Sequence, residues 1–336
     1  MNTPAHPHIV VEANIPFIRG VMESWATVDY LQPAQITPEV MQNADALVTR
    51  TRVKCDAALL GSSPCSIVAS ATIGLDHVDI PWCEARGIKV CNAPGCNAPA
   101  VAQYVLSSVL RLRGSKPLTL GIVGVGNVGK IVERWARALG MEVLLCDPPR
   151  ARRKGQEAFV SLSEIAGRAD VITFHTPYTT VGEDSTHHLF NSSLLPLLRR
   201  KPIIINAARG AVVDTAALIE AITTGKADAP VIDCWEGEPN ISPLLLEKAA
   251  YATPHIAGYS REGKARATKM AVEAVCRHFG EEVPRIEPEV PDAPASVTAQ
   301  ALIDSYDPAI DTRALRARPD AFEELRSTYS LRPEPM

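Results

Sequence analysis

The second half of the chain repeats one pattern, a short apolar run followed by a stretch with helical character. The runs are nearly free of polar residues, which is typical of parallel strands covered by helices on both faces. They are Leu120–Val123, Glu142–Cys146, Val171–Phe174, Ile203–Asn206, Val231–Asp233 and Tyr251–Thr253. The helical stretches are Val128–Leu139, Ser163–Gly167, Ser192–Leu198, Thr215–Thr223 and Pro243–Lys248. Strands joined by helical crossovers predict an α/β fold with a doubly wound parallel sheet.

A weaker series of the same kind occupies the first part of the chain. Its apolar runs are Ile9–Val11, Ala46–Thr49, Ile67–Ala69 and Ile88–Cys91, and its helical stretches include Phe17–Trp25 and Pro38–Asn43. This series predicts a second α/β sheet, and a length of 336 residues agrees with about two domains.

The end of the chain has a different composition. Prolines recur at positions 284, 288, 291 and 294, which predicts a linker after Gly280. Weak helical periodicity returns in Phe322–Tyr329. The tail is too short to build a core of its own, so we expect it to pack on the body or on a second subunit.

Composition narrows the class of protein. A net charge of −4 argues against nucleic-acid binding through bulk basic charge. No stretch reaches the roughly 18 apolar residues needed to span a bilayer, and the first residues do not resemble a secretory signal. The 8 cysteines form no C-x-x-C pair and no zinc-like cluster with histidine. We therefore expect a cytoplasmic protein with reduced thiols, no metal site and no membrane or nucleic-acid partner.

A glycine-rich loop follows the first strand of the second series. Gly124, Gly126 and Gly129 form the pattern G-x-G-x-x-G between that strand and a helix. In a Rossmann domain these glycines permit a tight turn, close approach of the pyrophosphate and helix–strand packing. Asp147 ends the next strand, where a carboxylate binds the ribose hydroxyls of NAD and repels the 2′-phosphate of NADP. The alternatives are a turn without ligand, or a 2′-phosphate held by the nearby Arg150, Arg152 and Arg153.

Three polar residues follow successive strands of the same series. Arg209, Glu238 and His255 come just after the last three apolar runs. Because the carboxyl ends of parallel strands line the ligand crevice, we expect these side chains to converge near the nicotinamide. Each also has an ordinary interpretation, as a surface arginine, a turn glutamate or a loop histidine. The nearby His187 and His188 are assigned no function.

The residue types suit hydride transfer at a 2-hydroxy acid. A histidine can exchange a proton with the reacting oxygen near neutral pH. A carboxylate beside the ring favours its protonated form and fixes its orientation, which we expect Glu238 to do for His255. The planar guanidinium of Arg209 matches a substrate carboxylate.

The chain resembles the D-2-hydroxyacid dehydrogenase family. The resemblance rests on Gly124–Gly129, Asn206–Gly210, Asp233–Pro239 and Pro254–Gly258, and extends from about residue 9 to 280. It implies a flavodoxin-like substrate domain at residues 1–98 and 257–280, and a Rossmann NAD-binding domain at 99–256, with the active site between them. Residues 281–336 would be a linker and a short C-terminal extension, or a reduced dimerisation segment of a homodimer.

The resemblance also implies a reaction and further site residues. Narrower similarities, at residues 71–79, 92–98, 145–150, 174–177, 255–259 and 262–266, point to members that act on a phosphorylated acid. The implied reaction is the oxidation of 4-phospho-D-erythronate to (R)-3-hydroxy-2-oxo-4-phosphobutanoate with NAD, a step in the synthesis of pyridoxal 5′-phosphate (vitamin B6). His255 would be the proton donor or acceptor. Implied cofactor contacts are Gly124, Gly126, Asn127, Val128, Gly129, Asp147, Thr176, Ala207, Ala208, Arg209, Asp233 and Gly258; implied substrate contacts are Thr51, Thr72 and Tyr259.

A phosphorylated substrate needs cationic partners, and Arg50 and Arg52 flank Thr51 just after a strand of the first series. We expect Arg50 to face the substrate, and Arg52 is equally consistent with a solvated loop. Two other functions remain open at this stage. One is a different D-2-hydroxyacid dehydrogenase, such as one for 3-phosphoglycerate, and the other is an NAD-sensing corepressor that uses the scaffold for binding alone.

Overall fold

The computed structural model describes residues 6–155 and 157–335, and it divides into two compact units. The first contains the residues up to Asn97 together with Arg261–Asp292, and the second contains Ala98–Ser260 and the residues from Ala293 onward. The segment that returns to the first unit is therefore 261–292, where the sequence predicts 257–280. The predicted extension, residues 281–336, is divided between the two units.

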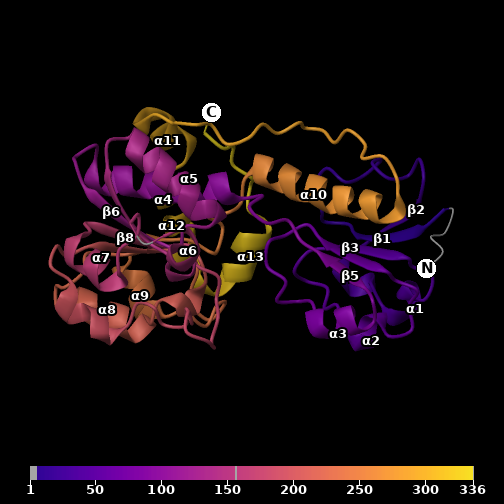
Figure 1. The fold of residues 1–336 in the computed structure, drawn as a ribbon, viewed down its shortest axis with the longest axis horizontal. Coiled ribbons are helices and arrows are strands. Elements are labelled where there is room, and N and C mark those ends of the chain that lie inside the picture. The colour runs from indigo at the N-terminus through magenta and orange to yellow at the C-terminus, as the bar shows by residue number, and fades with distance from the viewer. Residues whose placement is uncertain (1–5, 156, 336) are drawn as a thin grey trace. The chain divides into compact units, whose positions relative to one another are not determined.

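The first unit is built on a five-stranded parallel sheet in the order β2-β1-β3-β4-β5. Its strands are β1 (His8–Glu12), β2 (Thr27–Leu31), β3 (Ala46–Thr49), β4 (Ile67–Ser70) and β5 (Lys89–Cys91). Helix α10 (Arg261–Phe279) covers one face, and the other carries α1 (Pro38–Met41), α2 (Ala57–Leu60) and α3 (Ile80–Ala85) (Figure 1). Alternate side chains of β1 lie on opposite faces of the sheet: Ile9 and Val11 pack in one core, and Val10 packs in the other.

One sequence-based prediction in this unit is wrong, and one strand of its sheet is not predicted from sequence. Phe17–Trp25 is not a helix but a series of turns, in which the backbone of Phe17 has a φ of 63°. Its apolar residues Ile18 and Met22 are fully buried, so their helix-like spacing reflects core packing of an irregular segment. The strand β2 was not predicted because it lies at the sheet edge and no residue in it is fully covered.

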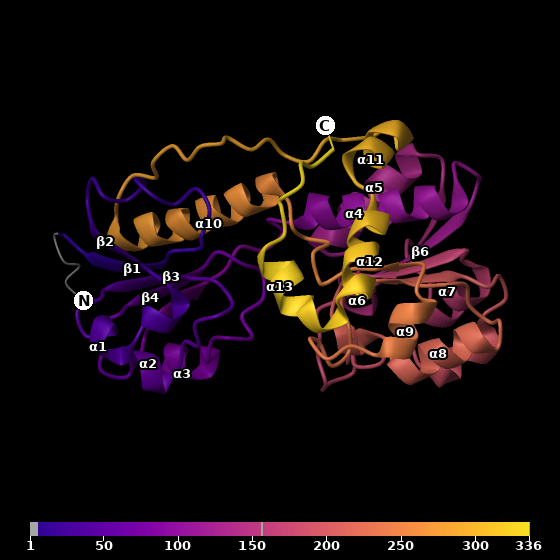
Figure 2. The same cartoon turned by 180° about the vertical axis from the view of Figure 1, so that it is seen from behind.

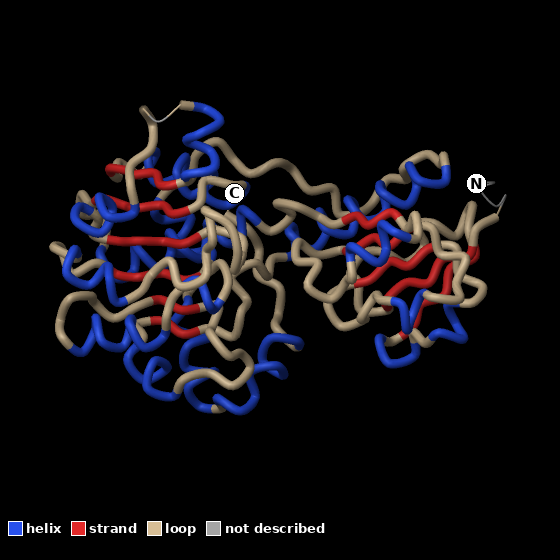
Figure 3. The backbone as a smooth tube through the Cα atoms, turned by 60° about the horizontal axis from the view of Figure 1, so that its bottom comes forward, coloured by secondary structure: helices blue, strands red, loops and turns tan. Residues whose placement is uncertain are grey.

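The second unit contains a six-stranded parallel sheet in the order β11-β10-β9-β8-β6-β7 (Figure 3). All six predicted strands are present, as β6 (Thr119–Val123), β7 (Glu142–Cys146), β8 (Val171–Phe174), β9 (Ile203–Asn206), β10 (Val231–Ile232) and β11 (Tyr251–Ala252). Val160 donates its amide to Leu145 of β7 at 2.8 Å, so residues after α6 run beside the sheet edge where a Rossmann sheet often has another strand. The predicted pair of doubly wound domains is confirmed.

Helices join these strands on both faces of the sheet. The predicted α8 (Thr215–Thr223) and α9 (Pro243–Lys248) have the expected bounds, and α5 (Asn127–Ala138) and α7 (Leu162–Arg168) differ by one residue at their ends. The stretch predicted as Ser192–Leu198 is a 3-10 helix, η2 (Ser192–Leu197), with Pro196 inside it. The remaining elements are α4 (Ala98–Arg113), α6 (Pro148–Lys154) and η3 (Gly210–Val212).

Helix α4 is almost entirely buried, and its polar residues are bonded within the protein. Ser107 donates to the carbonyl of Leu302 and Ser108 to that of Tyr104, at 2.9 Å and 2.7 Å. In the part of the chain that the structure describes, no helix has the length and apolar character required to cross a membrane.

The C-terminal segment completes the core of the second unit. It contains α11 (Ala299–Ser305), α12 (Pro308–Ala317), η4 (Pro319–Ala321) and α13 (Phe322–Ser327), with α11 beside α4 (Figure 2). Leu302 joins the core that contains α4 and α5, whereas Leu315 and Phe322 join the core on the other face of the sheet. This is the predicted packing of the tail on the body.

Arg332 anchors the end of the chain. Its side chain is almost fully buried and donates to the carbonyl oxygens of Ala100, Ile256 and Ala257. It also donates to the Gln103 side chain at 2.9 Å, and its guanidinium lies 4.3 Å from the centre of the Tyr306 ring. One side chain therefore joins the C-terminus to α4 and to the loop after β11.

We expect Arg332→Met to lower the free energy of unfolding of the second unit by about 3 kcal/mol, because several buried carbonyls would lose their donor. Arg313→Met, on an exposed position of α12, is the matched control and should cost less than about 0.5 kcal/mol. Denaturant unfolding measures both, and equal effects of the two substitutions would contradict this account of the tail.

Candidate active site

The glycine-rich loop has the geometry expected for binding a dinucleotide. Gly124 has a φ of 92°, and a Cβ there would lie 2.8 Å from the backbone of His175. A Cβ on Gly129 would collide with the carbonyl of Gly124, so this glycine lets the helix start against the strand. A Cβ on Gly126 meets nothing within 4 Å, which leaves open space above the loop. The geometry of Gly124 and Gly129 agrees with the predicted tight turn and helix–strand packing, and the approach of a pyrophosphate at Gly126 stays a prediction.

Helix α5 begins at this loop and presents amide groups to it. Its first intrahelical bond runs from the amide of Lys130 to the carbonyl of Gly126 at 3.2 Å. The amides of Asn127, Val128 and Gly129 precede that bond and are the groups that bind phosphate at a helix N-terminus.

The loop after β8 covers the glycine turn. The hydroxyl oxygen of Thr176 is buried and has no hydrogen-bond partner in the described residues, and its methyl group would touch a Cβ at Gly124. Burial lowers the pKa of the adjacent His175 to about 3, so this ring is neutral, and it bonds Thr173 at 3.0 Å. An unpaired buried hydroxyl beside the pyrophosphate loop fits the predicted contact of Thr176 with the cofactor.

Asp147 lies at the end of β7, where the sequence places it. Its carboxylate accepts bonds from the amides of Val125 at 2.8 Å and Arg150 at 3.0 Å, and it caps α6. Each oxygen keeps a lone pair that a ribose hydroxyl can use. The guanidinium of Arg150 bonds the carbonyl of Val125, and Arg152 pairs with Asp184, so both arginines already have acceptors in the protein.

The loops after β9 and β10 interlock. The side-chain amide of Asn206 donates to the carbonyls of Arg209, Gly210 and Cys234, at 3.0, 3.1 and 3.2 Å. A Cβ on Gly210 would collide with the backbone of Trp235, so the two loops are in direct contact. Arg209 and the loop that carries Glu238 are thereby held in register.

Asp233 joins the loop after β11 to this assembly. Its carboxylate is 1% exposed and accepts bonds from the Thr253 hydroxyl and the Ile256 amide, both at 2.7 Å, and from the Ala257 amide at 3.0 Å. Burial raises the pKa of Asp233, while the charge of His255 and these donors act in the opposite direction. The sequence implies a cofactor contact for Asp233, and the structure gives it a loop-fixing position beside that site.

His255 and Glu238 form a direct pair. The Nδ1 atom of His255 lies 2.6 Å from Glu238 Oε1, and the other oxygen of Glu238 accepts the amide of Trp235 at 3.1 Å. Burial would raise the pKa of Glu238, but the hydrogen bond and charge of His255 hold it below its ordinary value. The carboxylate is therefore ionised at neutral pH, and Nε2 of the ring is the nitrogen turned away from it.

Charges gather around Cys234 in the same loop. Glu238 and Asp233 act on its thiol together with the guanidinium groups of Arg209 and Arg326. Burial is the largest effect and raises the pKa of Cys234 well above its ordinary value, so the thiol is protonated and unreactive. The three predicted residues Arg209, Glu238 and His255 follow β9, β10 and β11, which are neighbours in the sheet, and so lie on adjoining loops at one edge of it. Ala207, Ala208, Gly258 and Tyr259 lie on these same loops.

The remaining predicted substrate contacts belong to the first unit. Arg50 and Thr51 follow β3, and Thr72 follows the neighbouring β4, so they share one edge of that sheet. The amide of Arg50 donates to Glu12 at 2.7 Å, and the Thr72 hydroxyl bonds Ser70 at 2.7 Å. Arg52 is exposed.

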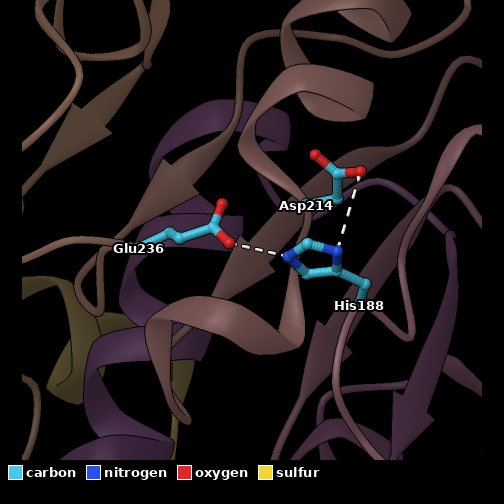
Figure 4. A group of neighbouring side chains, drawn as sticks. All are labelled: His188, Asp214 and Glu236. Carbon is cyan, nitrogen blue, oxygen red and sulfur yellow. Dashed lines mark hydrogen bonds and ion pairs between the residues drawn. The ribbon is translucent and has the colours of Figure 1, made fainter.

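A second histidine, His188, is assigned no function from sequence, and it connects two loops next to the active site. The ring of His188 lies between Glu236, 2.6 Å from Nε2, and Asp214, 3.8 Å from Nδ1 (Figure 4). Within the described residues this trio has the spacing of a metal-binding group. The two carboxylates approach opposite ring nitrogens. The contacts connect the loop after β10 to the N-terminus of α8, where Glu236 also accepts the amide of Thr215 at 3.1 Å.

Sequence reasoning missed several of these residues. Asn206 and Thr253 act through hydrogen bonds to loops distant in sequence, which no spacing reveals. Arg326 approaches Glu238 from α13, about 90 residues later. The contacts of His188 could not be predicted either, because its partners Asp214 and Glu236 lie on loops that follow other strands.

Comparison with known proteins agrees with this geometry. Residues 104–257 match the family model described as "D-isomer specific 2-hydroxyacid dehydrogenase, NAD binding domain". The erythronate-4-phosphate dehydrogenase of Bacteroides thetaiotaomicron is 45% identical, with 97% of each chain covered. The protein of the same name from Porphyromonas gingivalis is 42% identical, over 96% of this chain and 92% of the relative.

Solved structures show the same architecture. The TT0316 protein from Thermus thermophilus has a TM-score of 0.68 at 27% identity, covering 83% of this chain and 99% of the other. The D-lactate dehydrogenase from Aquifex aeolicus, complexed with NAD and lactic acid, has a TM-score of 0.64 at 25% identity, covering 82% and 96%.

The fold and the glycine loop define an NAD-dependent dehydrogenase. The chain belongs to the D-isomer specific 2-hydroxyacid dehydrogenase family, and within it to the group of erythronate-4-phosphate dehydrogenases. The residues fit the cofactor, since the open space at Gly126, the amides that begin α5 and the unpaired hydroxyl of Thr176 border one loop.

We expect Gly126→Ala to weaken NADH binding at least 10-fold without unfolding the protein, because the Cβ has room in the protein but would enter the space of the pyrophosphate. Gly167→Ala is the control, since its Cβ also has room, with Leu197 O at 3.9 Å as its nearest neighbour, and it lies on α7. NADH fluorescence titration measures both. Unchanged affinity in Gly126→Ala would contradict the proposed position of the pyrophosphate.

Proposed function

We propose that this chain catalyses the NAD-dependent oxidation of 4-phospho-D-erythronate to (R)-3-hydroxy-2-oxo-4-phosphobutanoate, a step in the synthesis of pyridoxal 5′-phosphate. The observation that carries the chemistry is the 2.6 Å contact between His255 and Glu238, on loops adjoining that of Arg209. The identity of the substrate is supported by relatives of 40–46% identity over nearly the whole chain that bear the name erythronate-4-phosphate dehydrogenase.

In the proposed mechanism His255 accepts the proton of the C2 hydroxyl on Nε2, while Glu238 stabilises the imidazolium that results. The C2–H bond breaks with its electron pair, and the C2–O bond becomes a carbonyl. Bound NAD supplies the acceptor for that hydride. Protonation of the oxygen by His255 reverses the step in the direction of reduction.

The substrate carboxylate is assigned to Arg209, whose guanidinium can bind it through two parallel hydrogen bonds. The loop geometry supports this role, because the Asn206 side chain accepts the amide of Ala208 and donates to the carbonyl of Arg209, on the two sides of the Arg209 side chain. Thr51, Thr72 and Tyr259 are proposed to bind the rest of the substrate, with Arg50 as a phosphate partner. The domain roles follow from this assignment, with the first unit, which contains Arg261–Asp292, as the substrate domain and the second unit, which contains Ala98–Ser260, as the NAD-binding domain.

Two finer properties belong to the same proposal. We propose a cytoplasmic location, which is supported by cysteines that are all unpaired and mostly buried among the described residues. We also propose a homodimer, on the family resemblance, with the C-terminal segment as a reduced dimerisation element. Light scattering of the purified protein tests the second, and a monomer at micromolar concentration would contradict it.

We expect His255→Gln to lower kcat for oxidation by at least 10³-fold while NADH binding stays within about threefold, because only proton transfer is lost. Glu238→Gln should lower kcat by about 10- to 100-fold. Glutamine has the shape of glutamate, but it lacks the charge that stabilises the imidazolium of His255. Steady-state kinetics and NADH titration measure these effects. Substantial turnover by His255→Gln would exclude it as the proton acceptor.

The substrate assignment is tested by comparing kcat/KM for 4-phospho-D-erythronate, 3-phosphoglycerate and D-lactate. The proposal expects 4-phospho-D-erythronate to lead, because specificity is the difference in transition-state binding between competing substrates. A higher value for 3-phosphoglycerate would assign the chain to another reaction of its family. NADH binding without turnover of any of the three would favour the corepressor-like function.

A further inference from the structure

The C-terminal helix α13 carries an arginine, Arg326, whose charge acts on the active-site loops. Arg326 lies in its last turn and is close enough to Glu238 for the two charges to interact. Its guanidinium is also close enough to the side chain of Tyr259, one of the residues assigned to the substrate, for the two groups to interact. The tail therefore reaches the site through this side chain as well as completing the core.

The position of α13 is fixed by the core beneath it. Phe322, its first residue, is 1% exposed and packs in the same cluster as Trp235 and Val212. Leu325 packs against that cluster as well. Because Phe322 and Leu325 both pack on this core, the position of the short helix that carries Arg326 is fixed by packing on the body of the unit.

The hydrogen-bonding capacity of Arg326 is only partly used. Its side chain is 24% exposed, and its nearest carboxylate in an ion pair, Glu323 Oε1, lies 3.4 Å from Nη1. The Nε atom is buried and has no acceptor among the described residues. Leaving a buried guanidinium donor unpaired is costly, so a ligand group that accepts a hydrogen bond from it would be stabilised here.

An anion is the partner that this arrangement fits. A guanidinium offers five donors in a planar fork, which matches the oxygens of a phosphate. Arg209 is assigned to the substrate carboxylate and His255 to the hydroxyl at C2. The remaining anionic group of the substrate is the phosphate, for which Arg50 of the first unit is already one proposed partner and Arg326 would be a second. Tyr259, beside the guanidinium, would help to orient the fork.

We propose that Arg326 is a substrate-binding residue that contacts the phosphate and sets the preference for a phosphorylated 2-hydroxy acid. This inference rests on the proposed function, in which the substrate is phosphorylated. It gives the C-terminal segment a direct part in specificity that neither its proline-rich composition nor its helical periodicity predicts.

The test is Arg326→Met, with kcat/KM measured for 4-phospho-D-erythronate and for D-erythronate, which lacks only the phosphate. The expected result is a loss of about 10- to 100-fold with the phosphorylated substrate and less than threefold with D-erythronate. Arg326→Lys should recover part of the loss, because it restores the charge without the fork. Arg318→Met is the control from the same segment, as Arg318 is 55% exposed and pairs with Glu324.

Equal losses with both substrates, or no loss with either, would overturn the assignment. Equal losses would mean that Arg326 acts only by supporting Glu238 or the fold, which NADH titration and thermal unfolding of the variant would separate. The proposed function is tested independently in the wild-type protein. Were 3-phosphoglycerate its better substrate, the same ratio measured with 3-phosphoglycerate and glycerate would still test Arg326.

Discussion

The buried carboxylate of Asp233 holds the active site together. Asp233 directly follows β10 in the sheet of the second unit. It accepts hydrogen bonds from the Thr253 hydroxyl and from the amides of Ile256 and Ala257, and so fixes the loop on both sides of His255. His255 has a φ of 56°, in the left-handed region that costs a non-glycine residue roughly 1–2 kcal/mol. The hydrogen bonds to Asp233 offset that cost and turn the imidazole toward Glu238.

The same carboxylate links the catalytic loop to the rest of the second unit. Thr253 bonds the hydroxyl of Tyr104 in α4 at 2.8 Å, and its carbonyl accepts the indole N–H of Trp235 at 2.9 Å. Arg332 reaches the carbonyls of Ile256 and Ala257 from the end of the chain. The loop that carries His255 is thus bonded to a helix, to the neighbouring loop and to the tail. Such support from outside the site is what keeps a proton-transferring group in a fixed geometry.

The sequence was informative wherever a local pattern determined the structure. The strands of the second unit and the glycine loop could be predicted because continuous apolar runs and the G-x-G-x-x-G spacing have local physical causes. The placement of Arg209, Glu238 and His255 on adjoining loops could be predicted because the carboxyl ends of parallel strands lie at one edge of a sheet. In contrast, Phe17–Trp25 has helical spacing but no helix, since its apolar side chains fill the core from irregular backbone. Arg326 and His188 could not be predicted, because their partners lie on distant segments that only the folded chain brings together.

The central claim is that this unit removes a hydride from C2 of a 2-hydroxy acid while His255 takes the hydroxyl proton. It is tested most directly by incubating the enzyme with NAD and 4-phospho-D-erythronate that carries deuterium at C2, and analysing the reduced cofactor by mass spectrometry. The account predicts one deuterium at C4 of the nicotinamide in every NADH formed. NADH without deuterium, or deuterium released to the solvent, would contradict it.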